Sequence, residues 1–135
     1  MANIDGVHAL TDVTGFGLLG HAREMALGAK LRARIKMRAV PVLPHAEQLA
    51  TEGHITGASA RNWAGYHQDI TLAPNINPLQ QALLTDPQTS GGLLVACADE
   101  VVADVISLFH SQGFAHASVI GEWVNGPPGV EVVSE

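Results

Sequence analysis

Thr11-Asp-Val-Thr-Gly-Phe-Gly-Leu-Leu-Gly-His21 is the segment from which the architecture follows, because a strand gives way to a helix within it. Residues Val7 to Thr11 are β-prone, and residues Gly15 to Leu27 carry apolar side chains at helical spacing. Asp12 and Thr14 are both candidates for the N-cap of this helix. We therefore expect a strand, a glycine-rich turn and a helix in that order.

The rest of the chain alternates between strand and helix patterns. Gly28 is a natural end for the first helix. Charged and apolar residues then alternate from Leu31 to Arg38, which is typical of a half-buried strand whose basic face is either solvated or directed at an anion. Residues Gly53 to Asn77 give a weak signal, typical either of a long loop or of short helical pieces around Ala60 to His67.

Further elements follow from the same patterns. The expected helices are Pro44 to Glu52, Pro78 to Leu84 with Asn77 as its cap, and Asp99 to Gln112 closed by Gly113. The expected strands are Leu93 to Ala98, predicted to be buried, and Ala117 to Val124 and Val130 to Val133, joined by a turn. Interleaved strands and helices predict the α/β class, a mixed α+β fold with helices packed on a mixed β-sheet.

Length and composition point to one domain that meets a partner. The chain has 135 residues, so we expect residues 1–135 to form a single domain. Charged residues make up 15% of the chain, well below the roughly 25% of an average soluble domain. Such a composition suits a protein that hides surface against another domain or subunit, and equally a compact aliphatic domain with a rather neutral surface.

Charge, cysteine content and hydropathy argue against several classes of function. The net charge of -6 argues against a nucleic-acid partner, which requires clustered basic side chains. Cys97 is the only cysteine, so an intramolecular disulfide is impossible and a reducing compartment fits. No apolar run approaches the roughly 18 residues of a membrane span, and the N-terminus lacks a signal-peptide pattern. We expect a cytoplasmic protein without membrane contact.

The first segment also carries chemistry. Asp12 is a hard oxygen ligand of the kind that Mg²⁺ takes, and Mg²⁺ usually binds one or two protein carboxylates. The glycines that follow permit close approach of a ligand, and the N–H groups of a helix start favour phosphate. Taken alone, the segment is more typical of a plain cap and turn, and its glycine spacing matches neither a P-loop nor a dinucleotide-binding motif.

A second segment, Leu84-Thr-Asp-Pro-Gln-Thr-Ser-Gly-Gly-Leu-Leu94, combines a carboxylate, several hydroxyls and two glycines before an apolar run. Alone it is typical of a tight loop that leads into a strand. Together, the two segments resemble those of the selenophosphate synthetase (selenide, water dikinase) family. The opening Ala2-Asn-Ile-Asp-Gly-Val7 and the pair Arg61-Asn62 resemble that family as well.

The resemblance covers the C-terminal domain of that family, which is similar to the aminoimidazole-ribonucleotide synthetase superfamily. It implies a two-domain, homodimeric enzyme that makes selenophosphate, AMP and phosphate from selenide, ATP and water. The catalytic Cys or selenocysteine, an essential Lys and further metal-binding Asp residues lie in the family's N-terminal domain, which is absent from this chain. The resemblance thus implies that the N-terminal domain is this chain's partner and that the chain is inactive alone.

The resemblance also implies site residues. Asp12 matches the family's Mg²⁺-binding Asp, so Mg²⁺ is the expected metal and ATP the expected nucleotide substrate. Thr11, Thr14 and Gly15 surround Asp12 and are candidate contacts to phosphate or to the ligands of the metal. No catalytic residue is expected in this chain.

Other reactive side chains are expected to be structural. Cys97 ends an apolar run without an adjacent His or cationic residue to lower its pKa, so we expect a buried structural thiol. The seven histidines show no pair at metal-ligand spacing. His21 is expected to pack or hydrogen-bond within its helix rather than act as a catalytic base.

Two alternatives remain open at this point. The chain is also compatible with another enzyme of the superfamily, such as an aminoimidazole-ribonucleotide synthetase or a thiamine-monophosphate kinase. It is also compatible with a different class of function, a non-catalytic dimerisation or binding module, because its charge content is low and no nucleophile is present.

Overall fold

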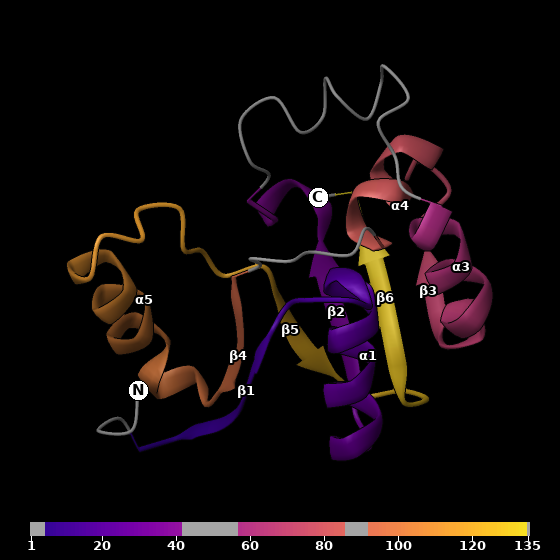
Figure 1. Ribbon diagram of the computed structural model, residues 1–135. Helices are drawn as coiled ribbons and strands as arrows, with labels where there is room; N and C mark the ends of the chain where they lie inside the picture. Colours follow the sequence, from indigo (N-terminus) through magenta and orange to yellow (C-terminus); the bar gives the residue numbers. More distant parts are fainter. Residues whose placement is uncertain (1–4, 42–56, 86–91, 135) are drawn as a thin grey trace.

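The computed structural model describes residues 5–41, 57–85 and 92–134, and the expected helix Pro44 to Glu52 lies outside these ranges. Its elements are β1 (Val7–Asp12), α1 (Gly17–Ala29), β2 (Arg32–Lys36), α3 (Gly57–Tyr66), β3 (Ile70–Leu72), α4 (Pro78–Thr85), β4 (Leu93–Cys97), α5 (Val102–Ser111), β5 (Gly121–Val124) and β6 (Gly129–Val133) (Figure 1). The mixed α and β class predicted from the sequence is confirmed. The weak region from residue 57 onward contains α3 and β3 rather than one long loop.

The strands form two sheets. A four-stranded sheet has the order β3-β6-β2-β5, in which β2 is parallel to β6 and antiparallel to β5. A separate two-stranded antiparallel sheet joins β1 to β4. Because β2 lies between β5 and β6, the turn that joins β5 and β6 crosses the end of β2 instead of forming a hairpin.

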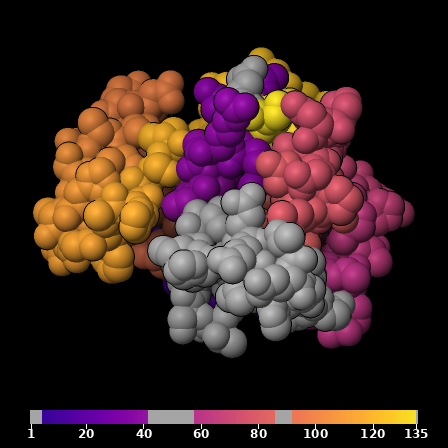
Figure 2. All heavy atoms as spheres, turned by 90° about the horizontal axis from the view of Figure 1, so that it is seen from above, coloured from indigo at the N-terminus to yellow at the C-terminus, as the bar shows by residue number. Residues whose placement is uncertain are grey.

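The main core lies between the four-stranded sheet and the helices. Helix α1 lies across β2 and β6, and α3 and α4 pack beside it (Figure 1). The buried core side chains are Leu19, Ala22, Ala33, Ile35, Met37, Tyr66, Ile70, Leu84, Val130 and Val132. Seen from above, the orange α5 region and the pink α3 and α4 region lie on opposite sides of the molecule (Figure 2). No helix among the described residues is long and apolar enough to cross a membrane.

Two helix ends follow their local sequence signals. At the start of α4, the Gln80 N–H donates to Asn77 Oδ1 at 2.8 Å and the Asn77 N–H donates to Gln80 Oε1 at 3.0 Å. This reciprocal pair is a capping box, and it confirms Asn77 as the cap. At the end of α5, Gly113 has a φ of +92° and the Phe114 N–H donates to the Phe109 carbonyl at 2.9 Å. Gly113 therefore closes α5 as predicted.

Both predicted ends of α1 are wrong. The helix starts at Gly17 with Phe16 at the N-cap and no side-chain cap bond, so neither Asp12 nor Thr14 caps it. It continues through Gly28 and ends where Lys30 adopts a left-handed φ of 58° and the Leu31 N–H donates to the Ala26 carbonyl at 3.0 Å. A glycine inside a helix costs only about 1 kcal/mol, and the packed face of α1 outweighs that penalty.

Strand β4 is not buried as the sequence predicts. Leu93 in β4 and Leu10 in β1 are each 47% exposed. The two strands form a ribbon of their own, and β1 alternates between half-buried and exposed residues. The apolar run of β4 therefore lies partly at the surface, because no third strand or helix among the described residues covers both faces of the ribbon.

Two arginines on the basic face of β2 are paired within the sheet, whereas Lys36 at the end of the strand is exposed, as the solvated interpretation of the sequence pattern predicts. Arg32 Nε lies 2.8 Å from Glu131 Oε1 and Arg34 Nε lies 3.1 Å from Glu131 Oε2, so one carboxylate of β6 bridges two arginines. The Arg32 side chain is only 16% exposed. The hydrogen bond from Arg32, with a smaller contribution from Arg34, lowers the pKa of Glu131.

We predict that Glu131→Gln destabilises the fold at neutral pH by about 1 kcal/mol, because two partly buried arginines lose their carboxylate. A lowered folded-state pKa means that this stabilisation is present above the ordinary carboxyl pKa and disappears as the pH falls through the folded value. Urea unfolding at pH 7 and at about pH 3 measures both effects. Glu122→Gln is the matched control, because Glu122 lies 3.7 Å from Arg34 and is exposed. An equal penalty for Glu131→Gln at both pH values would contradict this account.

Candidate functional site

Asp12 lies at the junction of the two segments singled out in the sequence. It is the last residue of β1, its side chain is exposed, and its partner across the ribbon is Leu93, the first residue of β4. The next residue, Val13, donates its N–H to the Gly92 carbonyl at 2.9 Å. The antiparallel pairing of β1 with β4 thus brings Asp12 beside the described end of the second segment.

The glycine-rich turn meets the other described end of the second segment. The Gly17 N–H donates to the Thr14 carbonyl at 3.0 Å, which closes the turn before α1. Gly17 has a φ of +72°, and a Cβ atom there would lie 2.7 Å from the carbonyl carbon of Thr85. Only glycine allows the turn to pack against the backbone at the end of α4 in this way.

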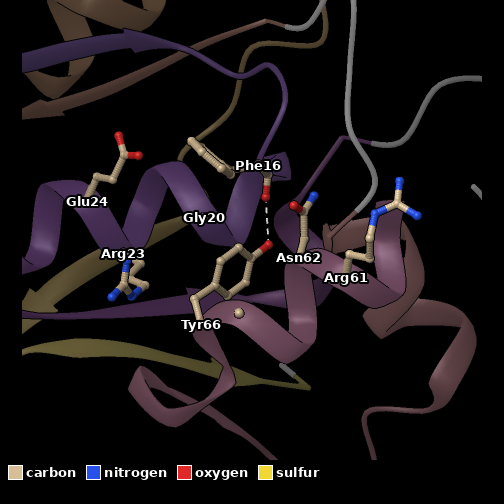
Figure 3. A pocket seen from close by; sticks show the side chains of 8 residues that line it. Phe16, Gly20, Arg23, Glu24, Arg61, Asn62 and Tyr66 are labelled. Atoms are coloured by element: carbon tan, nitrogen blue, oxygen red, sulfur yellow. Dashed lines mark hydrogen bonds between the residues drawn. The ribbon is translucent and has the colours of Figure 1, made fainter. Parts of the chain in front are cut away.

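Helix α3 connects both segments through polar side chains. Asn62 Nδ2 donates to the Gly15 carbonyl at 3.0 Å and to the Thr85 carbonyl at 2.9 Å. The Tyr66 hydroxyl donates to the Phe16 carbonyl at 2.6 Å (Figure 3). Burial raises the pKa of Tyr66 to about 12, so its hydroxyl remains a neutral donor at physiological pH. The turn is therefore fixed from one side by α3.

The other predicted site residues flank Asp12, with Thr11 in β1 and Thr14 and Gly15 in the turn that follows. Thr11 is half-buried, with its hydroxyl 3.4 Å from the Asp12 carbonyl. Thr14 Oγ1 lies 3.3 Å from His21 Nε2. His21 is 7% exposed and packs within α1, as expected of a packing residue. Its Nδ1 has no hydrogen-bond partner among the described residues, and the nearest carboxylate oxygen, of Glu24, is 3.7 Å away.

Asp12 places one carboxylate at the junction. Within residues 5–41, 57–85 and 92–134, no three His, Cys, Asp or Glu side chains gather in a way that would hold a metal ion. A single exposed carboxylate nevertheless fits Mg²⁺, which keeps several water and phosphate ligands. The described residues alone therefore do not form a complete metal site.

Cys97 does not lie in a nucleophilic setting. It is half-buried in β4, less buried than the sequence predicts. Burial, and then the charge of Asp99, raises the pKa of its thiol. A thiol with a raised pKa is predominantly protonated at neutral pH and is a poor nucleophile.

A pocket of about 230 Å³ opens between α1 and α3 (Figure 3). Its walls include Phe16, Gly20, Arg23, Glu24, Arg61, Asn62, Gly65 and Tyr66. Arg23 is bound to Asp69 at 2.7 Å, so its charge is already neutralised. The pocket thus adjoins the turn through Asn62 and Tyr66, on the side of the turn that faces α3.

Sequence reasoning assigns no role to Asn62, although the pair Arg61-Asn62 contributes to the family resemblance. Its two acceptors lie 47 and 23 residues away in the chain. No spacing rule connects positions so far apart. The contact could be found only from the packing of α3 against α1 and α4.

The chain is similar to proteins of one family over nearly its whole length. Residues 1–134 match the family described as AIR synthase related protein, C-terminal domain. The chain is 58% identical over 132 residues to a selenide, water dikinase of Burkholderia orbicola, covering 98% of this chain and 37% of that protein. It is 53% identical over 133 residues to the selenide, water dikinase of Dechloromonas aromatica, with coverages of 98% and 38%. The chain thus spans well under half the length of these relatives.

Solved structures with the same fold are more distant in sequence. The hydrogenase maturation protein HypE of E. coli superimposes with a TM-score of 0.68 at 22% identity, covering 96% of this chain and 32% of that one. A thiamine-monophosphate kinase from Stenotrophomonas maltophilia gives a TM-score of 0.58 at 16% identity, with the same coverages. At these identities the likeness concerns the fold alone.

We predict that Gly17→Ala destabilises the protein by roughly 2–4 kcal/mol, because alanine is disfavoured at this φ and its Cβ collides with the Thr85 backbone. Gly15→Ala is the matched control in the same turn, because a Cβ there meets nothing within 4 Å. We expect it to change stability by no more than about 0.5 kcal/mol. Denaturant unfolding of both variants measures the difference, and similar losses would contradict the packing described here.

Proposed function

Because the chain belongs to the AIR synthase related C-terminal domain family, we propose that it is the C-terminal domain of a selenophosphate synthetase (selenide, water dikinase). The full-length enzyme would make selenophosphate, AMP and phosphate from selenide, ATP and water. Two relatives that bear that name are 58% and 53% identical to nearly the whole chain, which supports this choice. The observation that carries the proposal is the junction of the Asp12 turn with the end of α4, because it brings together the two segments on which the resemblance rests.

We infer that Asp12 supplies one carboxylate to a Mg²⁺ site shared with the upstream domain. The pairing of β1 with β4 and the bond from Val13 to Gly92 hold the backbone at Asp12. Its side chain is exposed at the end of the strand, where another domain can reach it. When bound, Mg²⁺ would neutralise phosphate charge, which is the main requirement of phosphoryl transfer.

We further propose that Thr11, Thr14 and Gly15 contact phosphate or the ligands of the metal. Thr14 and Gly15 lie in the turn that starts α1, whose N-terminal N–H groups have no side-chain cap. Thr11 precedes Asp12 on the same strand. The upstream domain would supply the remaining ligands and the nucleophile, so residues 1–135 alone are expected to be inactive. A cytoplasmic homodimer is the expected form of the whole protein.

A second candidate function is a non-catalytic binding or dimerisation module. The exposed Leu10 and Leu93 on the β1–β4 ribbon favour it, because apolar side chains at a surface are typical of an interface. The two candidates differ in what they require of Asp12. A module needs no carboxylate there, whereas the enzyme does.

We predict that Asp12→Asn lowers selenide-dependent AMP formation by the full-length protein by about 100-fold or more, because a neutral amide is a much weaker ligand for Mg²⁺ than a carboxylate. The assay supplies ATP, Mg²⁺ and selenide, with parallel reactions in which aminoimidazole or thiamine precursors replace selenide. Asp104→Asn, at an exposed position on α5, is the matched control and should leave turnover unchanged.

Normal turnover of the Asp12→Asn protein would show that this domain is mainly structural, in favour of the module. Turnover only with a precursor other than selenide would assign the chain to another enzyme of the superfamily.

A further inference from the structure

The polar side chains of α3 that contact the junction share one face of the helix. Ser59, Asn62 and Tyr66 are spaced i, i+3 and i+7, which places them on one side of an α-helix. The Ser59 hydroxyl lies 2.6 Å from the Thr85 hydroxyl, and both groups are buried. Asn62 contacts both segments, and Tyr66 contacts Phe16. We name these three residues the α3 bracket.

Asn62 is the member of the α3 bracket that links the two segments directly. A side-chain amide has two N–H donors, and the two carbonyls at 3.0 Å and 2.9 Å match that number. One acceptor, the Thr85 carbonyl, lies in the last turn of α4, where backbone carbonyls have no partner within the helix. The other, the Gly15 carbonyl, belongs to the turn that follows Asp12.

The two neighbours of Asn62 in the α3 bracket are themselves anchored. Tyr66 is buried in the main core, and its ring lies against Gly20 of α1, where an added Cβ would come within 2.9 Å of it. Ser59 is 3% exposed and is also within 3.2 Å of the Ala82 carbonyl in α4. Anchors on both sides leave Asn62 little freedom to follow a displaced turn. The spacing of the two segments is therefore set by α3.

We propose that Asn62 is a positioning residue for the phosphoryl-transfer site. Its amide holds the Gly15 carbonyl at a fixed distance from the end of α4, and this fixes the backbone that carries Asp12 and Thr14. The residue touches no reacting group in this role and acts through the turn. The inference rests on the proposed function for its catalytic consequence, whereas the link between the two segments rests on the hydrogen bonds alone.

The chemistry of the amide explains why other side chains fail at this position. Asn62→Asp keeps the shape of the side chain, but an ionised carboxylate cannot donate a hydrogen bond and would face two carbonyl oxygens at hydrogen-bond distance. A protonated carboxyl group can donate one hydrogen bond and would restore part of the link. Asn62→Ala removes the link at every pH. The pair of variants therefore separates loss of donors from loss of packing.

The test uses the full-length protein with Asn62→Asp, Asn62→Ala and the control Asn75→Ala, whose amide contacts Ser134 at an exposed site instead. Amide hydrogen exchange reports on the link without reference to activity. We expect the amides of Val13 and Gly17 to exchange about tenfold faster in both Asn62 variants, with β2 and β6 unchanged. Unchanged exchange at Val13 and Gly17 would overturn the inference.

Kinetics on the folded proteins then test the catalytic consequence. Selenide-dependent kcat should fall about tenfold or more in both Asn62 variants, and the apparent dissociation constant for Mg²⁺ should rise. For Asn62→Asp alone, the ratio of its kcat to the wild-type value should increase as the pH falls from about 8 to about 6, because a carboxyl group beside two carbonyl oxygens has a raised pKa.

Full activity of either Asn62 variant would overturn the positioning role. A wild-type protein without selenide-dependent activity, combined with faster exchange in the variants, would instead overturn the proposed function and leave the structural link in place.

Discussion

The backbone of Gly17 packs directly against the backbone of Thr85. A Cβ atom at residue 17 would lie 2.7 Å from the Thr85 carbonyl carbon. This contact fixes the first residue of α1 relative to the last residue of α4. Because α1 covers β2 and β6, the same contact also sets how the main core closes. Asn62 of α3 stabilises this contact, because its side-chain amide donates both to the Gly15 carbonyl in the turn and to the Thr85 carbonyl at the end of α4.

The two sheets differ in how their faces are covered. The four-stranded sheet has an apolar face under α1 and a second face on which Glu131 pairs with both Arg32 and Arg34. The β1–β4 ribbon has no such arrangement and exposes two leucines beside Asp12. A two-stranded sheet is marginal by itself.

Elements with local signals could be predicted from the sequence. The cap at Asn77 and the glycine that closes α5 depend on residues within a few positions of each other, and both are as expected, although the return bond from Asn77 to Gln80 is not among the predictions. The end of α1 and the exposure of β4 depend on packing between distant segments, so propensity alone misplaces them. For the site, the sequence indicates Asp12 and its turn, but it contains no signal that an amide of α3 connects that turn to the end of α4.

We propose that Asp12 lies within a metal–ATP site that the rest of the protein completes. The most direct measurement replaces Mg²⁺ with Mn²⁺, which accepts the same oxygen ligands, in isotopically labelled full-length protein with ATP. We expect the paramagnetic ion to broaden the amide signals of residues 12–15 and to leave those of β2 and β6 sharp. In Asp12→Asn, we expect the signals of residues 12–15 to stay sharp. Sharp signals at residues 12–15 with Mn²⁺ and ATP bound, or equal broadening in Asp12→Asn, would contradict this proposal.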